Sequence, residues 1–154
     1  MNHDTDQKNR RWLNSVTHHH WLTREGLALF EFHRQARLAS GGFAVLNGDG
    51  RIPDGASADT MLTARMAHSC ALAALQGLPG AAAMTEHAIR ALSGKLRDEH
   101  HGGWFGADPA TSDDRTKQCY THHFVALGAA TATHADIPGA AALLEEAIGV
   151  IDTR

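Results

Sequence analysis

The chain has little of what marks several common classes of protein. Its only cysteines are Cys70 and Cys119, too few for the disulfide framework of a small secreted domain, so we predict two buried free thiols. No apolar run approaches the roughly 20 residues that cross a bilayer. The net charge of -3 gives no basic surface for nucleic acid or an acidic membrane. Residues 1–11 are polar and lack the apolar core of a signal peptide, so we expect a cytoplasmic protein.

Motifs for metal binding are also missing, although the chain has 12 histidines. Several of these histidines are adjacent in sequence, and neighbouring positions on a helix point in different directions. There is no His-Glu-x-x-His or Cys-x-x-Cys spacing. A calcium loop beginning at Asn47 would put Ala58 where the bidentate glutamate belongs. The sequence therefore predicts no dedicated metal site.

What the chain does have is an internal repeat. Residues 78–89 return as residues 137–148 at an offset of 59, and each copy begins with a Pro-Gly turn before a run of alanines. Gly41-Gly42-Phe43 returns as Gly102-Gly103-Trp104 at an offset of 61. Such self-similarity is typical of architectures in which each unit buries its apolar face on its neighbours. The next Gly-Gly-aromatic element would fall beyond Arg154, so we expect the chain to stop within a repeat.

Helical periodicity predicts five helices, over about residues 21–37, 57–76, 81–98, 116–134 and 140–154. Ser57 or Asp59 is the predicted N-cap of the second helix. Residues 43–46 are expected to form a short strand closed by a turn at residues 47–50. Paired helices occur in solenoids and simple bundles. The long polar loop at residues 108–115 favours instead a closed barrel of helical hairpins with its loops at one end.

The second predicted helix places an arginine among small and apolar residues. Met61, Arg65 and His68 lie at positions i, i+4 and i+7 and share one face. An arginine in such a setting needs an acidic partner or a polar ligand. An ion pair with Asp59 or Glu86 is the simpler interpretation from the sequence alone.

The fourth predicted helix begins with a second group of candidate residues. By the repeat, Tyr120 takes the position of Met61 and Phe124 that of Arg65. His122 lies two residues from Tyr120, about 200° around an ideal helix. The two side chains therefore reach one site only if the first turn of this helix is irregular.

Five short motifs follow one another in the chain from about residue 18 onward. They are His20-Trp21-Leu22, the stretch of residues 42–50, Thr63-Ala64-Arg65-Met66, Gly102-Gly103-Trp104, and Lys117-Gln118-x-Tyr120-x-His122. Together and in this order they resemble the N-acylglucosamine 2-epimerase superfamily. Their order and spacing are most similar to its bacterial branch of mannose and sulfoquinovose isomerases, which are aldose–ketose isomerases.

The resemblance implies an all-α fold, the N-terminal portion of an (α/α)6 barrel, over residues 18–154 after a flexible tail at residues 1–17. It implies a monosaccharide site at the loop end of the barrel, with Arg65, Tyr120, His122 and His68 as the substrate-binding residues. The implied reaction passes through a cis-enediol and needs neither a metal nor a nicotinamide cofactor. The family's general acid and base are histidines of later hairpins, so neither role is assigned here, and we expect the isolated chain to be inactive.

Two other functions stay open at this point. The chain could be a non-catalytic helical-repeat module whose exposed face binds a peptide or a second copy, since the last helix is apolar and uncapped. It could also be a piece of an (α/α)6 glycoside hydrolase with paired carboxylates. The only nearby pair is Asp113-Asp114, which a solvated loop explains better.

Overall fold

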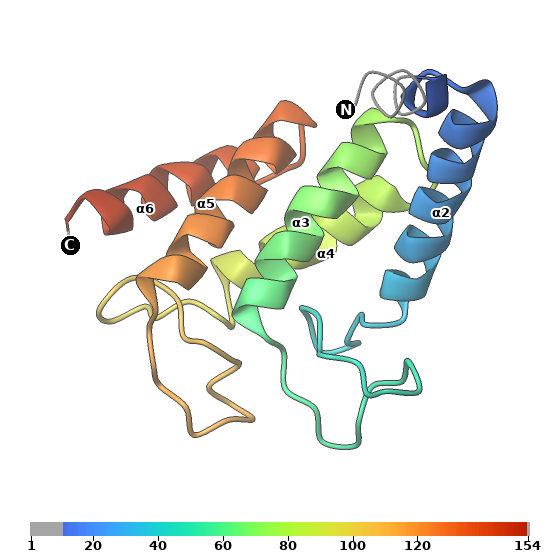
Figure 1. The fold of residues 1–154 in the computed structure, drawn as a ribbon. Coiled ribbons are helices and arrows are strands. Elements are labelled where there is room, and N and C mark those ends of the chain that lie inside the picture. Colours follow the sequence, from blue (N-terminus) through green and yellow to red (C-terminus); the bar gives the residue numbers. More distant parts are fainter. Residues whose placement is uncertain (1–10, 154) are drawn as a thin grey trace, which may run out of the picture. The chain divides into compact units, whose positions relative to one another are not determined.

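The protein is built from helices joined by loops (Figure 1). The computed structural model describes residues 11–153, and in that part of the chain the β-pairing consists of three isolated bridges. The chain divides into two compact units, Met1–Arg34 and Gln35–Arg154. Every helix between residues 11 and 153 is too short or too polar to span a bilayer. The prediction of an all-helical chain is confirmed.

The first unit contains helix α2 (Val16–Arg34). This helix begins before the predicted start at Trp21 and ends before the predicted end at Arg37. Near its end, Arg34 forms an ion pair of 2.9 Å with Glu31 one turn earlier. Residues 1–10 lie outside the described residues, and residues 16 and 17 already belong to α2. The flexible tail expected at residues 1–17 stays a prediction.

The second unit contains two helical hairpins. The first consists of α3 (Thr60–Leu75) and α4 (Ala81–Ser93), and the second of α5 (Cys119–His134) and α6 (Ala140–Asp152). Helix α3 packs against both α4 and α5, and α5 packs against α6 (Figure 1). The hairpins therefore join through α3 and α5, as the alternation of helices predicted.

The turns inside the two hairpins have the same geometry. Leu78 and Ile137 each donate a backbone hydrogen bond of 3.0 Å to the carbonyl oxygen five residues earlier. The residue before each of them is left-handed, with φ of 77° at Gly77 and 55° at Asp136. A left-handed residue ends a helix by closing its last turn, and aspartate tolerates this conformation better than most side chains do. The 59-residue repeat of the sequence is thus a repeat of structure.

The helix boundaries and the predicted strand need corrections. The helix expected over residues 81–98 ends at Ser93, and the one expected from residue 116 begins at Cys119. Residues 43–46 form no strand. Only Phe43 pairs, in one bridge with Arg37, because its own amide hydrogen bonds to a side chain of α3 and not to a neighbouring strand.

Other local predictions hold. Asp59 is the N-cap of α3, and its carboxylate accepts a hydrogen bond of 2.6 Å from the amide of Leu62. The turn at residues 47–50 is closed by a bond of 3.0 Å from the Gly50 amide to the Asn47 carbonyl. Cys70 and Cys119 are not joined in a disulfide, as predicted, but the predicted burial holds only for Cys70. Cys119 is exposed because it begins α5.

Helices α3 and α5 approach each other closely at Gly128. A Cβ atom at this position would lie 2.6 Å from the carbonyl oxygen of Ala64 and 3.2 Å from the Cβ of Ala67. The first distance is shorter than real Cβ atoms show, so a side chain at residue 128 would push the two backbones apart. This contact fixes the spacing of the helices that carry the candidate site.

Candidate functional site

A Gly-Gly-aromatic loop lies against the first turn of each of the helices α3 and α5. Phe43 and Trp104, the aromatic residues of the two loops, are completely buried. The amide of Phe43 donates a hydrogen bond of 3.0 Å to Thr63 Oγ1, and the amide of Trp104 donates one of 3.1 Å to His122 Nε2. Thr63 and His122 occupy equivalent positions of the repeat. Both loops are therefore held by a side chain that accepts from the aromatic residue's backbone.

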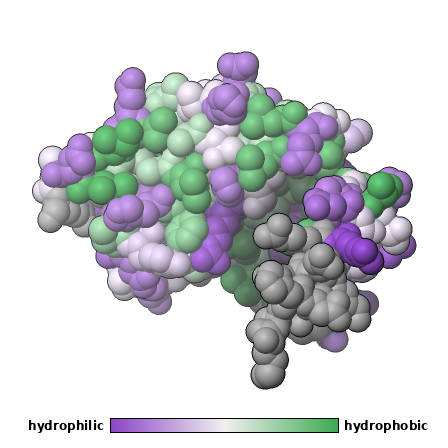
Figure 2. All heavy atoms as spheres, turned by 45° about the horizontal axis from the view of Figure 1, so that its top comes forward, coloured by the Kyte–Doolittle hydropathy of each residue, from purple (hydrophilic) through white to green (hydrophobic). Residues whose placement is uncertain are grey.

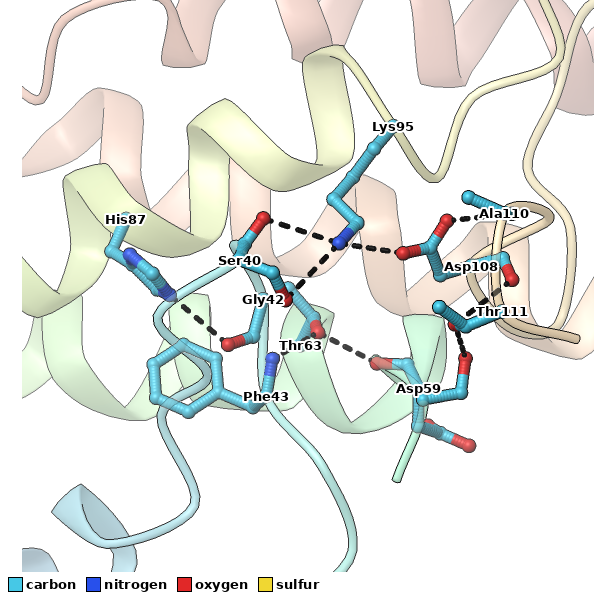
Figure 3. A network of polar contacts seen from close by, with 11 residues as sticks. Ser40, Gly42, Phe43, Asp59, Thr63, His87, Lys95, Asp108, Ala110 and Thr111 are labelled. Atoms are coloured by element: carbon cyan, nitrogen blue, oxygen red, sulfur yellow. Dashed lines mark hydrogen bonds and ion pairs between the residues drawn. The ribbon is translucent and has the colours of Figure 1, made fainter. Parts of the chain in front are cut away.

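The first loop is also tied to α4 and to the loop of residues 108–111 (Figure 3). His87 of α4 donates from Nε2 to the carbonyl of Gly42 at 3.0 Å. Burial lowers the pKa of His87, which keeps the ring neutral while Nε2 carries its proton. Lys95 donates to the Ser40 carbonyl at 3.1 Å and forms an ion pair of 2.6 Å with the buried Asp108 (Figure 3). These contacts fix the loop that precedes α3.

A carboxylate organises the second loop. The side chain of Asp98 accepts hydrogen bonds from the amides of His100 and His101 and forms an ion pair of 2.6 Å with Lys117. Lys117 also donates to the carbonyl of Gly102 at 2.7 Å. The hydrogen bond from Lys117 is the main reason that the pKa of Asp98 lies well below its usual range, and the two backbone amides add to it.

Arg65 is exposed and is not paired with a carboxylate of the described residues. The predicted ion pair with Asp59 or Glu86 is wrong, because both carboxylates are used locally. Asp59 caps its own helix, and Glu86 pairs with Arg90 at 3.3 Å. The charge of Arg65 is thus not neutralised by an ion pair with any residue between 11 and 153.

Aromatic side chains of α5 hold the guanidinium in place of a carboxylate. The Cζ atom of Arg65 lies 4.4 Å from the ring centroid of Phe124, which is a cation–π distance. Tyr120 stands edge-on to Phe124, with ring centroids 5.0 Å apart and an angle of 84°. Its hydroxyl lies 3.4 Å from Arg65 Nη2. The structure therefore brings together the predicted site residues Arg65 and Tyr120.

His68 lies one helical turn beyond Arg65 on α3. Its Nδ1 is 2.7 Å from the hydroxyl oxygen of Thr131 on α5, and both side chains are part-buried. Like Arg65, His68 contacts α5, so the two side chains occupy the part of α3 that borders α5. This agrees with the shared face predicted from their spacing.

His122 is not brought to this group. Its side chain is 1% exposed, while that of Tyr120 is 60% exposed. The ring of His122 packs against Trp104, with centroids 5.6 Å apart. Because α5 is a regular helix from Cys119 onward, residues 120 and 122 point to different sides of it. The substrate contact expected of His122 stays a prediction, and its position is one that supports the second loop.

Two residues of the site, Phe124 and Thr131, are not among the substrate-binding residues expected from the sequence. The repeat places Phe124 at the position of Arg65, and it predicts that both face the same way. It does not predict that residues equivalent in successive repeats touch each other, because that depends on the distance between α3 and α5. No motif marks Thr131 either, since a threonine inside a helix is common.

The chain resembles known sugar isomerases over most of its length. Residues 41–154 match the N-acylglucosamine 2-epimerase (GlcNAc 2-epimerase) family. A D-mannose isomerase of Pseudomonas cannabina pv. alisalensis is 49% identical over 143 residues, which cover 93% of this chain and 34% of that protein. A D-mannose isomerase of Thermobifida fusca is 43% identical over 145 residues, covering 93% of this chain and 36% of that protein.

A solved structure shows the same fold. The crystal structure of a D-mannose isomerase superposes with a TM-score of 0.77 at 22% sequence identity, over 90% of this chain and 36% of that one. The predicted fold, part of an (α/α)6 barrel, is thereby confirmed. The chain spans about a third of the length of the relatives it matches. It belongs to the N-acylglucosamine 2-epimerase family.

Proposed function

We propose that the face shared by α3 and α5 binds a monosaccharide in an aldose–ketose isomerase or 2-epimerase. The observation that carries this proposal is the state of Arg65. Its guanidinium rests on the ring of Phe124 and meets the hydroxyl of Tyr120, and no carboxylate of the described residues neutralises it. A planar group with five donors held in this way suits the hydroxyl and carbonyl oxygens of a sugar.

The reaction that fits the named relatives is the interconversion of mannose and fructose. A base removes the proton alpha to the carbonyl of the open-chain sugar, a cis-enediol forms, and the proton returns to the neighbouring carbon. Negative charge develops on the carbonyl oxygen during proton removal, and a cation nearby stabilises it. Arg65 is the residue of this chain suited to that role. We assign neither the general acid nor the general base to a residue of this chain. We expect the 154-residue chain to bind the sugar without converting it.

Substitution of Arg65 tests the proposal. Arg65→Gln keeps a polar side chain but removes the charge, and we expect it to weaken D-mannose binding about tenfold or more, since hydrogen bonds from charged groups contribute about 1.5–3 kcal/mol. Calorimetric titration of the purified chain measures the effect. Arg90→Gln is the matched control, because Arg90 is an exposed arginine on α4 paired with Glu86. Equal mannose affinity in Arg65→Gln and the unchanged chain would refute the role of Arg65.

One observation favours a second candidate, a helical module that binds another protein or a second copy. Large apolar side chains are exposed on three helices, at Leu72, Leu75, Leu127 and Ile148, and apolar areas reach the surface on the face drawn in Figure 2. The mannose titration separates the two candidates. A module of this kind would show no saturable binding of mannose, and its state of association would depend on concentration.

A further inference from the structure

The hydrogen bonds around Thr131 define which nitrogen of His68 carries a proton. The Thr131 hydroxyl donates to the carbonyl oxygen of Leu127 at 3.0 Å, the bond back to the preceding turn that is common for threonine in helices. A hydroxyl has one proton to donate and two lone pairs to accept with. Toward His68, 2.7 Å away, Thr131 Oγ1 is therefore the acceptor, and His68 Nδ1 is the donor.

This arrangement leaves the other nitrogen of the ring as an acceptor. A neutral imidazole has one N–H, so a proton on Nδ1 leaves a lone pair on Nε2. His68 Nε2 makes no hydrogen bond within the described part of the chain. It is also not among the buried atoms that lack a partner there, so part of its surface is accessible.

The neighbouring side chain on this face has the opposite character. Arg65, one turn before His68 on α3, has only donors. Its guanidinium is held by Phe124 and Tyr120, and the ring of His68 is held by Thr131. Residues of α5 therefore orient both side chains. Consecutive turns of α3 thus present a donor group and an acceptor atom. A sugar offers matching groups on adjacent carbons, an oxygen that accepts and a hydroxyl that donates.

We infer that Thr131 is a positioning residue which fixes neutral His68 as the Nδ1–H tautomer, so that Nε2 accepts a hydrogen bond from a hydroxyl of the bound monosaccharide. The inference rests on the proposed function for the identity of the ligand, but the tautomer of His68 is a property of the protein alone. In this arrangement His68 accepts a hydrogen bond from one hydroxyl of the sugar, while Arg65 donates hydrogen bonds to a sugar oxygen.

Two measurements test the inference on the 154-residue chain. Long-range 1H–15N correlation spectra, recorded in alkaline buffer where imidazoles are neutral, report the tautomer of His68 without any sugar. We expect Nε2 of His68 to be the nitrogen without a proton. In Thr131→Val, which removes the hydroxyl and keeps the branched shape, we expect the tautomer preference to disappear. Calorimetric titration should then show D-mannose binding weakened by about 3- to 10-fold, the usual range for one hydrogen bond.

Two variants serve as controls. Thr131→Ser keeps the hydroxyl and should restore both the tautomer and the mannose affinity. Thr133→Val removes a hydroxyl with the same kind of bond on the same helix, from Thr133 Oγ1 to the Ala129 carbonyl at 2.8 Å. It should change neither measurement, because its hydroxyl does not bond to a histidine.

The outcomes are distinguishable. A proton on Nε2 of His68 in the unchanged chain would overturn the inference, and so would equal mannose affinity in Thr131→Val and the unchanged chain. If the unchanged chain binds no mannose, the proposed function fails. The spectra then still decide whether Thr131 fixes the acceptor atom of His68.

Discussion

The two repeats of this chain use the same backbone with different side chains. Each Gly-Gly-aromatic loop forms one β-bridge, at Phe43 or Trp104. The amide of that residue donates a hydrogen bond to a side chain in the first turn of the helix that follows. That side chain is a threonine in the first repeat and a histidine in the second. The positions of the candidate site differ more, with the exposed Arg65 on α3 and the half-buried Phe124 at the equivalent position of α5. The residues that hold the two loops share the role of acceptor, whereas the two site residues share no chemical role.

The contacts between repeats show a second difference. Gly128 of α5 is buried against α3, whereas Ser69, the equivalent residue of α3, is exposed. Equivalent residues therefore do not have equivalent neighbours, since Gly128 faces the other helix of the pair and Ser69 does not. The requirement for glycine is a property of the α3–α5 contact and not of the repeat.

The largest effect is expected from breaking this contact. Gly128→Ala would place a Cβ atom 2.6 Å from the Ala64 carbonyl, and we expect it to lower the free energy of unfolding by about 3 kcal/mol, at the upper end for an overpacked core. Gly149→Ala in α6 is the control, because nothing lies within 4 Å of its Cβ position. It should be neutral or stabilise by up to about 1 kcal/mol through helix propensity. Urea denaturation measures both, and equal stability of the two variants would contradict the close approach.

A smaller effect is expected from removing the acceptor under either loop. Thr63→Val leaves the buried amide of Phe43 without its acceptor, and His122→Leu does the same to Trp104. Each should cost about 2 kcal/mol, the usual penalty for a buried donor left unpaired.

Hydrogen exchange then shows whether the loops are held independently. We expect faster exchange of the Phe43 amide only in Thr63→Val, and of the Trp104 amide only in His122→Leu. Thr63→Ser keeps the hydroxyl and should protect Phe43 as the unchanged chain does. Faster exchange of both amides in either variant would mean that the two loops open together.

The smallest expected effect is on stability at acid pH, and it should distinguish the second loop from the first. Asp98 has no counterpart in the first loop. Its amide donates to the carbonyl of Gly103, and the residue whose amide donates to the matching carbonyl, that of Gly42, is Leu38. Because the pKa of Asp98 is lowered in the folded protein, its stabilising effect is complete above the ordinary aspartate pKa of about 3.9. It is lost progressively as the pH falls below that value toward the lower pKa of the folded state.

Asp98→Asn tests whether this carboxylate governs stability at acid pH. The variant should be less stable than the unchanged chain at neutral pH, and its free energy of unfolding should fall less steeply below about pH 4. Urea denaturation at a series of pH values measures the slope, with Asp113→Asn as a control on an exposed loop carboxylate. An unchanged slope in Asp98→Asn would show that other carboxylates govern acid unfolding.

Much of the fold follows from local sequence signals. The Pro-Gly turns, the Asp59 cap and the turn at residues 47–50 depend on a few neighbouring residues, and each was predicted. The strand at residues 43–46 was wrong because its pattern of apolar residues is satisfied by burial of Phe43 and Ala44 in a loop. Periodicity reports which residues are buried, and it does not say whether a strand or a loop buries them.

The candidate site was predictable in part. Helix geometry alone puts Tyr120 and His122 on different sides of α5, and the structure agrees. The partner of Arg65 could not be predicted, because a guanidinium can pair with a carboxylate or with an aromatic ring. Only the α3–α5 distance shows that Phe124 is within reach. The same distance decides the contact between His68 and Thr131, residues that are 63 positions apart.

The contact between Arg65 and Phe124 has a consequence for how ligand preference changes in such a protein. The two residues occupy one register position of successive repeats, and each forms part of the other's surroundings. Replacing the arginine uncovers an aromatic ring, and replacing the ring frees a cation to move. Variants with altered sugar selectivity are therefore best sought by varying residues 65 and 124 together, as a pair, since either single change alters two components of the surface at once.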